Sequence, residues 1–241
     1  GKIQNKQEQT MTNGEQTPIE EYNIQGHDIF VKREDLFLSY AQPMAPALAK
    51  LRGARIRLVR MREAGVVKVA CFDTRISKSG QGIAYLCKEL NIHCAVGYPK
   101  LKAQRELNEP QQKAKDMGAE VWPVEAGRTA PCYAAFKRFA EEKGYTVLPL
   151  GITFPETAKE VMKITKAETE KFNTIVVSTG TGTIACGIAM GTKAKVFGIS
   201  CGMNIQRQME RVMKIAGNRP ENLFLVQTKY ENYEALNTTS C

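Results

Sequence analysis

Short apolar runs alternate with helical patterns along most of this chain. Runs rich in β-branched and aromatic residues predict strands at 28–32, 66–72, 93–98, 120–124, 145–150, 174–178, 195–200 and 222–227. Between them, the spacing of apolar positions predicts helices near 50–62, 80–90, 101–117, 130–143, 155–170, 184–190 and 204–217. Strands that alternate with helices of this length form βαβ units, so the pattern predicts an α/β fold with two parallel sheets. The interface of the two units is the expected place for a ligand.

The segment Phe172–Gly191, FNTIVVSTGTGTIACGIAMG, carries the most informative chemistry. A predicted buried strand runs into the loop Gly180-Thr181-Gly182-Thr183, which is followed by a predicted helix. The glycines would allow close backbone approach, and a helix N-terminus offers unpaired N–H groups at the positive end of its dipole. We therefore expect the loop to bind a phosphate or a carboxylate.

Three other interpretations of this loop differ in the residues that they require. The G-x-G-x-x-A spacing from Gly180 to Ala185 would suit a dinucleotide, but that fingerprint expects an acidic residue about 20 positions further on. The corresponding segment here is Cys201–Asn204, which has none. The P-loop pattern G-x-x-x-x-G-K-[ST] is absent from the chain. A tight strand-to-helix turn without a ligand remains an alternative.

Composition places few further limits on the function. The chain has 241 residues, of which 43% are hydrophobic and 24% charged, as in soluble globular proteins. No apolar run approaches the roughly 20 residues of a membrane span, and the polar N-terminus does not resemble a signal peptide, so a cytoplasmic protein is expected. Seven cysteines without C-x-x-C spacing predict reduced thiols in the core and no metal site.

A net charge of +9 allows a polyanionic partner without requiring one. The densest basic run, Lys50–Arg62, places cations all around a predicted helix and has no interleaved aromatic residues. A solvated helix with some internal anchoring is therefore favoured over a nucleic-acid surface.

Several separated motifs, taken in order, resemble one enzyme superfamily. They are Thr17-Pro18-Ile19, the segment Phe30–Leu36 (FVKREDL), Lys50, the segment Ile76–Ala84 (ISKSGQGIA) and the loop that begins at Gly180. Together they are similar to elements of the fold-type II pyridoxal-phosphate enzymes, which include tryptophan synthase β, threonine deaminase, cysteine synthase and aminocyclopropane-carboxylate deaminase. The resemblance covers roughly Thr17 to Ser200.

The resemblance implies a cofactor and a set of site residues. Lys50 lies where these enzymes carry the lysine that forms a Schiff base with pyridoxal 5'-phosphate. The cofactor phosphate would be held by Gly180, Thr181, Gly182 and Thr183, and the substrate by Ser77, Ser79, Gly80 and Gln81. The alternatives are that Lys50 is a surface lysine and that Ser79 caps a helix without any ligand.

The resemblance also implies how the chain is organised. Residues 1–16 are expected to form a flexible arm, 17–63 and 151–241 a larger domain that contains the phosphate loop, and 64–150 a smaller inner βαβ domain. A homodimer is expected. The chain begins without Met and is shorter than typical members, so one or both ends are expected to be missing.

Two departures from the family pattern concern the cofactor. Lys78 stands where these enzymes carry an asparagine that contacts the phenolic oxygen, so it would place a positive charge there unless its long stem carries it into solvent. The partner of the pyridine nitrogen cannot be assigned, although Thr238, Thr239, Ser240 and Cys241 are candidates.

The expected function is a pyridoxal-phosphate-dependent lyase, deaminase or β-replacement enzyme that acts on a small amino acid or amino-acid-like group. The reaction subtype stays open, because the cofactor supplies the electron sink and the protein selects the bond that breaks. Two alternatives remain: a cofactor-free relative that uses the same cleft for binding, and a pyridoxal-phosphate enzyme whose amino-acid group is attached to nucleic acid.

Overall fold

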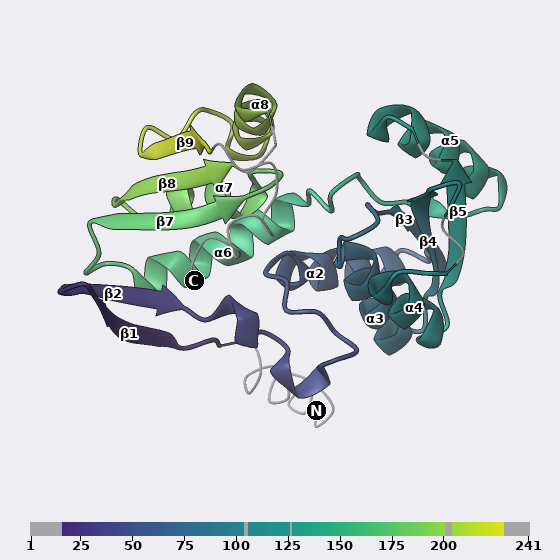
Figure 1. Cartoon of the computed structure of the whole chain (residues 1–241), viewed down its shortest axis with the longest axis horizontal. Coiled ribbons are helices and arrows are strands. Elements are labelled where there is room, and N and C mark those ends of the chain that lie inside the picture. Colours follow the sequence, from purple (N-terminus) through teal and green to yellow (C-terminus); the bar gives the residue numbers. More distant parts are fainter. Residues whose placement is uncertain (1–15, 104–105, 126, 201–203, 229–241) are drawn as a thin grey trace. The chain divides into compact units, whose positions relative to one another are not determined.

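The computed structural model describes residues 16–103, 106–125, 127–200 and 204–228. The chain divides into two compact units, shown with their element labels in Figure 1. Unit 1 comprises residues up to Ala49 together with Arg62–Leu150, and unit 2 comprises Lys50–Met61 together with the residues from Gly151 onward. Within the described ranges, no helix has the length and hydropathy of a membrane span. No group of three or more potential metal ligands occurs there either.

Unit 1 is built on a four-stranded parallel sheet in the order β5-β4-β3-β6. Its strands are β3 (Lys68–Phe72), β4 (His93–Lys100), β5 (Glu120–Glu125) and β6 (Thr146–Val147). The connecting helices are α3 (Ser79–Leu90), α4 (Glu109–Asp116) and α5 (Thr129–Glu142). All crossovers return to the same end of the sheet, so the loops that follow the carboxyl ends of the strands share one edge.

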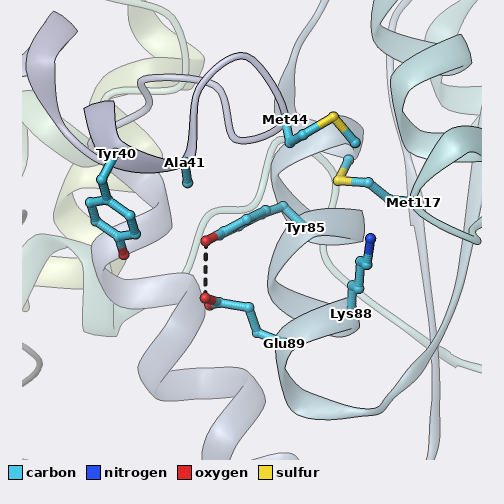
Figure 2. A pocket seen from close by; sticks show the side chains of 7 residues that line it. All are labelled: Tyr40, Ala41, Met44, Tyr85, Lys88, Glu89 and Met117. Carbon is cyan, nitrogen blue, oxygen red and sulfur yellow. Dashed lines mark hydrogen bonds between the residues drawn. The ribbon is translucent and has the colours of Figure 1, made fainter.

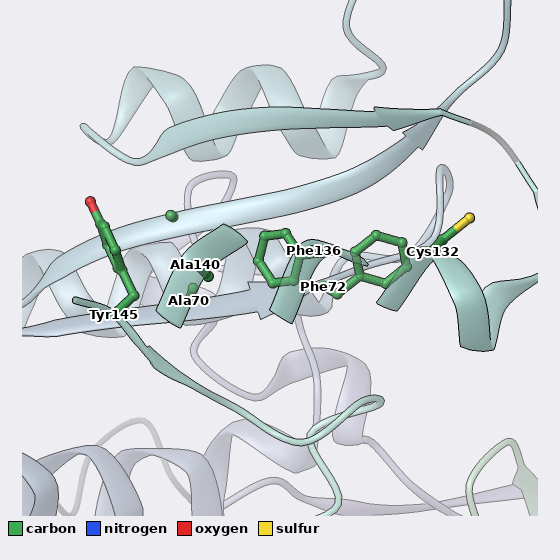
Figure 3. Close-up of a cluster of buried hydrophobic side chains, with 7 residues drawn as sticks. Ala70, Phe72, Cys132, Phe136, Ala140 and Tyr145 are labelled. Atoms are coloured by element: carbon green, nitrogen blue, oxygen red, sulfur yellow. The ribbon is translucent and has the colours of Figure 1, made fainter. Parts of the chain in front are cut away.

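One face of this sheet is covered by α5 through an aromatic cluster (Figure 3). Phe136 packs against Phe72 with ring centroids 5.5 Å apart. Gly97 provides the space for Phe136, because a Cβ at this position would lie 2.3 Å from its ring. The other face packs on α3, where a Cβ at Gly80 would lie 2.6 Å from the side chain of Val96. Helices on both faces explain why β3 is buried along almost its whole length.

Buried thiols contribute to this packing, as the composition predicts. Hydrogen bonds with Cys71 and Cys87, together with burial, raise the pKa of the Cys94 thiol well above its usual value. These three cysteines, Cys132 and Cys186 are buried and free. The predicted core position of the cysteines is thus confirmed for the five that the structure describes.

The N-terminal part of unit 1 is an antiparallel hairpin of β1 (Ile19–Ile24) and β2 (His27–Lys32), followed by 3₁₀ turns at Glu34–Leu36 and Ser39–Ala41. The Gln81 amide of α3 donates to the carbonyl oxygens of Pro43 (3.0 Å) and Met44 (2.7 Å). These two hydrogen bonds help to explain one difference from the sequence prediction. Residues 17–49 group with 62–150 in unit 1, whereas the sequence pattern predicts a domain that joins them to 151–241.

Unit 2 has a three-stranded parallel sheet in the order β7-β8-β9, formed by β7 (Thr174–Thr179), β8 (Lys195–Ser200) and β9 (Leu223–Gln227). Its helices are α2 (Lys50–Glu63, which ends just beyond the unit), α6 (Pro155–Glu168), α7 (Thr183–Gly191) and α8 (Ile205–Ala216). Small and β-branched side chains from α6, α7, α8 and the sheet form the core.

Glycines allow two helices to approach α6 closely. A Cβ at Gly53 of α2 would lie 2.0 Å from the backbone nitrogen of Thr157, and one at Gly187 of α7 would lie 2.5 Å from the carbonyl oxygen of Ala158. Neither position can accept a larger side chain without moving a backbone. The basic helix α2 is anchored further by ion pairs of Arg57 and Arg60 with Glu156. The predicted internal anchoring of this helix is therefore confirmed.

The α/β fold with parallel sheets is confirmed, with a few local differences. The helix expected at 101–117 begins at Glu109, because Pro110 is suited to a first helical turn. The strand expected at 145–150 is reduced to β6, whose end is followed closely by Pro149. Strand β1 was not predicted. Apart from Gln16, the predicted flexible arm lies outside the described residues.

The contact of α2 with α6 generates a test of stability. We expect Gly53→Ala to lower the free energy of unfolding by about 1–3 kcal/mol, because the added methyl group overlaps the backbone at Thr157. Gly127→Ala is the matched control, since its Cβ would meet only Cys132 Sγ at 3.5 Å, an ordinary contact. Urea unfolding of both variants measures the difference. Equal stability of the two variants would contradict the close packing.

Candidate functional site

Lys50 is the first residue of α2 and is half-buried. Its Nζ donates a hydrogen bond to the carbonyl oxygen of Gly151 at 2.8 Å. The hydroxyl of Thr157 donates to the carbonyl oxygen of Lys50 at 3.1 Å, beside the close contact at Gly53. Both ends of Lys50 are therefore held by residues about a hundred positions further along the chain. This arrangement distinguishes it from an ordinary surface lysine.

The loop between β7 and α7 lies next to the same glycine. A Cβ at Gly151 would lie 2.7 Å from Thr181 Cγ2, so Gly151 contacts Lys50 through its oxygen and lies close to Thr181 through its α-carbon. Unit 2 thus brings together two elements that the sequence predicted separately, namely the lysine and the loop. Both Lys50 and the loop lie at helix N-termini, where a bound anion is favoured.

The four predicted phosphate-binding residues differ in exposure. Gly180 and Thr181 are half-buried, whereas Gly182 and Thr183 are buried. The hydroxyls of Thr181 and Thr183 are 3.0 Å apart and share a hydrogen bond. Because Thr183 is buried, its hydroxyl orients Thr181, and an anion would be bound chiefly through the open part of the loop at Gly180 and Thr181.

Glycine is needed at position 182 for a structural reason that the sequence did not suggest. The sequence suggested that it allows close approach of a phosphate, but a Cβ here would point toward α8, 3.2 Å from the carbonyl oxygen of Gln208 and 3.2 Å from Val212 Cγ2. Its φ of +91° also lies in the left-handed region. Glycine is therefore required by the backbone conformation and by the packing of α8.

Gln208 contacts the candidate site, and the sequence analysis did not single it out. It is fully buried, and its Nε2 lies within hydrogen-bonding distance of the oxygens of Thr179 (3.3 Å), Gly180 (2.5 Å) and Ser200 Oγ (3.0 Å). These contacts hold the carbonyl groups at the carboxyl end of β7 toward α8. The sequence does contain a sign of this role, because Gln208 is a polar residue on the apolar face of the helix predicted at 204–217.

The loop that follows β3 in unit 1 contains the predicted substrate residues. Here Asp73, which the sequence analysis also missed, is buried, and its carboxylate accepts hydrogen bonds from the N–H groups of Thr74 (3.0 Å) and Gly80 (2.6 Å). Ser77 Oγ accepts from the N–H of Ser79 at 3.2 Å. Ser79 is the first residue of α3 and makes no side-chain cap, so the alternative role proposed for it is wrong. Asp73 and Ser77 bind the N-terminal N–H groups instead.

The other two residues expected near this loop have separate environments. Gln81 is buried, and both hydrogens of its amide are used by Pro43 and Met44, so a contact with substrate would have to come from another of its atoms. Lys78 is exposed and precedes α3. The hydrogen bond from Lys113, and to a lesser extent the charge of Lys78, lower the pKa of Glu109. Contact of Lys78 with a cofactor stays a prediction, as does each substrate role.

A pocket of about 470 Å³ in unit 1 is a separate feature (Figure 2). Tyr85 donates a hydrogen bond to Glu89 there at 2.9 Å. The lining contains none of the predicted site residues and comprises Tyr40, Ala41, Met44, Tyr85, Lys88, Glu89 and Met117. The candidates for the pyridine-nitrogen partner, Thr238 to Cys241, lie outside the described residues.

The groups in unit 2 suit a phosphorylated aldehyde cofactor. Lys50 supplies an amine, and the N-terminus of α7 supplies backbone N–H donors and the hydroxyl of Thr181. Cys186, on the same helix, is buried, and burial raises the pKa of its thiol to about 11, which disfavours the reactive thiolate. The described part of unit 2 thus offers an amine together with hydrogen-bond donors that suit an anion.

Comparisons with known proteins agree with this chemistry. A family model described as pyridoxal-phosphate dependent enzyme matches residues 11–222. The glycyl-dTMP PLP-dependent decarboxylase of Pseudomonas phage M6 is 31% identical over 184 residues, which cover 73% of this chain and 64% of that protein. The chain therefore spans slightly less than two thirds of this relative's length.

Solved structures show the same fold at low sequence identity. An ACC deaminase homologue superposes with a TM-score of 0.72 and 20% identity, covering 88% of this chain and 71% of the other. Maize serine racemase gives a TM-score of 0.67 and 14% identity, covering 93% of this chain and 77% of the other. Because the family model matches most of the chain and the fold agrees, the chain belongs to the family of pyridoxal-phosphate-dependent enzymes.

Proposed function

We propose that this chain uses pyridoxal phosphate, held by Lys50 and the loop Gly180–Thr183, to act on an amino-acid group. The observation that carries the proposal is the position of Gly151, which accepts the hydrogen bond of the Lys50 amine and lies against Thr181. An amine and an anion-binding helix N-terminus are thereby held close together in one compact unit. They are the two protein groups that a phosphorylated aldehyde requires.

When bound, the cofactor supplies an electron sink for the bond that breaks at the substrate's α-carbon. The protein's part is orientation and proton transfer. The carbonyl of Gly151 directs the Lys50 amine, and Thr157 fixes the backbone from which this side chain extends. A lysine amine held in this way can deliver a proton to the α-carbon after the bond has broken.

The loop after β3 is the proposed site for the substrate carboxylate. Asp73 already occupies the N–H group of Gly80, so a carboxylate would depend on the hydroxyls of Ser77 and Ser79 and on the cation of Lys78. With these groups, a substrate carboxylate would be held by charge attraction and hydroxyl groups more than by backbone N–H groups. This arrangement is consistent with a lysine at the position where an uncharged asparagine was expected.

We propose decarboxylation of an amino-acid group carried by a nucleotide as the reaction. The support is the name of the 31% identical relative, a decarboxylase of glycyl-dTMP. In this reaction the bond to the carboxyl group breaks, carbon dioxide leaves, and a proton is added to the α-carbon. A decarboxylase is a lyase, so this proposal narrows the expected lyase activity to decarboxylation. Homodimer formation and a cytoplasmic location remain predictions.

A lyase or deaminase of free amino acids is the second candidate. The structural neighbours include deaminases, racemases and ammonia lyases, but at 14–20% identity they support the fold alone. The products separate the two candidates. Incubation with a glycyl-substituted thymidine nucleotide should release carbon dioxide without ammonia, whereas release of ammonia from free amino acids would favour the second candidate.

The proposed role of Lys50 predicts where the cofactor is attached. After incubation with pyridoxal phosphate and reduction with borohydride, peptide mass mapping should find the cofactor's mass on the peptide that contains Lys50. Lys50→Gln should abolish this adduct and the visible absorbance of the protein. Lys159→Gln, at an exposed position of α6, is the control and should retain both. An adduct confined to another lysine would exclude the proposed attachment.

The position of Gln208 predicts a separate effect on cofactor affinity. In Gln208→Leu, the oxygens at the end of β7 lose their buried donor, which should weaken pyridoxal phosphate binding about tenfold or more, at a cost of roughly 1–3 kcal/mol. Gln206→Leu, exposed on the same helix, should bind the cofactor like the unsubstituted protein. Absorbance titration measures both affinities. The same affinity in both variants would show that the loop does not depend on Gln208.

A further inference from the structure

Cations gather at one edge of the unit 1 sheet. Strands β3, β4 and β5 are parallel neighbours, so the loops after their carboxyl ends lie at the same edge. Among the described residues of these strand ends and loops, five are basic, and we name them the cationic rim: Arg75, Lys78, Lys100, Lys102 and Arg128. Four of the five are exposed, and Arg75 is half-buried. The rim thus faces solvent at the end of the sheet where parallel α/β folds bind their ligands.

Carboxylates neutralise little of this charge. None of the five cations forms a salt bridge with a described carboxylate. Asp73 is buried and occupied by backbone N–H groups, and Glu109 is paired chiefly with Lys113, with a smaller attraction to Lys78. Glu106 and Glu125 are the other acidic residues described at these strand ends and loops. The balance at this edge is therefore positive.

The amount and spread of charge exceed what a single amino-acid carboxylate needs. Neighbouring strands are about 4.8 Å apart, so cations on three of them are spread over roughly 10 Å. A nucleic-acid strand carries one phosphate per roughly 3.4 Å of helix rise, so a few consecutive phosphates match this spread. Two large apolar side chains, Ile76 and Leu101, are 56% and 43% exposed in the same loops. They provide apolar surface beside the charges for a sugar or a base.

The loop after β3 is already ordered by its own hydrogen bonds. The side-chain amides of Asn108 and Gln111 donate to the carbonyl oxygen of Arg75 at 2.9 and 3.1 Å. The N–H of Ser77 donates to Thr74 Oγ1 at 3.2 Å. A loop that is held in place before binding loses little conformational entropy when a ligand arrives. The backbone that carries Arg75 is therefore a preformed part of the rim.

We propose that the cationic rim binds the phosphates of a DNA strand, so that the amino-acid group is presented on DNA and not on a free nucleotide. The inference rests on the proposed function, whose support includes a relative named for a thymidine nucleotide. The basic helix α2 is a poorer candidate, because Arg57 and Arg60 are paired with Glu156. The rim assigns the nucleic-acid contact to unit 1.

Binding of a fluorescent single-stranded oligonucleotide, followed by anisotropy at several salt concentrations between about 50 and about 200 mM, tests the proposal. The variant carries Lys100→Gln and Lys102→Gln, neither of which belongs to the proposed cofactor or substrate residues. We expect its affinity to fall by on the order of tenfold at the lowest salt, and its salt slope to fall by about 1.4, since each phosphate contact on a single strand contributes about 0.7.

The matched control removes the same charge from the opposite edge of the sheet. Lys88 and Lys115 are exposed in the last turns of α3 and α4. The variant with Lys88→Gln and Lys115→Gln should keep the affinity and the salt slope of the unsubstituted protein. Equal losses in both double variants would overturn the proposal, because binding would then follow net charge alone.

Two further outcomes would overturn it: absence of salt-dependent binding by the unsubstituted protein, and competition by dTMP as effective as that by unlabelled oligonucleotide. The second would indicate a site for a single phosphate. Attachment of pyridoxal phosphate to Lys50 is measured without DNA, so failure of the rim and failure of the proposed function are distinguishable. If the rim binds DNA and Lys50 is not modified, only the proposed function fails.

Discussion

The close contact between α2 and α6 is the constraint on which the candidate site depends. Gly53 has no side chain, so the backbone of Thr157 can approach α2, and the Thr157 hydroxyl can reach the carbonyl oxygen of Lys50. Lys50 then begins its helix at the position from which its amine reaches Gly151. A larger residue at 53 would move the start of α2, and with it the amine, away from this carbonyl group.

The same kind of packing positions the other half of the site. Gly187 and Gly191 allow α7 to lie against α6, with would-be Cβ atoms 2.5 Å from the carbonyl oxygens of Ala158 and Met162. The N-terminus of α7 carries the loop, and Gln208 of α8 holds the loop's carbonyl groups. Dispersion contacts between closely packed backbones, with a few buried hydrogen bonds, therefore fix an amine beside the loop that we propose binds the phosphate.

Much of this could be predicted from the sequence, because it follows from local patterns. Alternating strands and helices gave the α/β fold, and Lys50 and the loop at Gly180 were identified from motifs. The function of Gly182 could not be foreseen, since its neighbour Gln208 lies 26 positions away and meets it only in the folded chain. The contacts of Asp73 and Gln81 were likewise not foreseen, because their partners are backbone groups that no side-chain pattern reveals. Tertiary hydrogen bonds to the backbone are therefore the part that sequence patterns do not encode.

A crystal structure of the protein loaded with pyridoxal phosphate tests the central claim most directly. The account predicts continuous density between the cofactor and Lys50 Nζ, with the phosphate within hydrogen-bonding distance of the backbone N–H groups at Gly180 and Thr181 and of the Thr181 hydroxyl. A cofactor bound to another lysine, or a phosphate bound away from the N-terminus of α7, would contradict it.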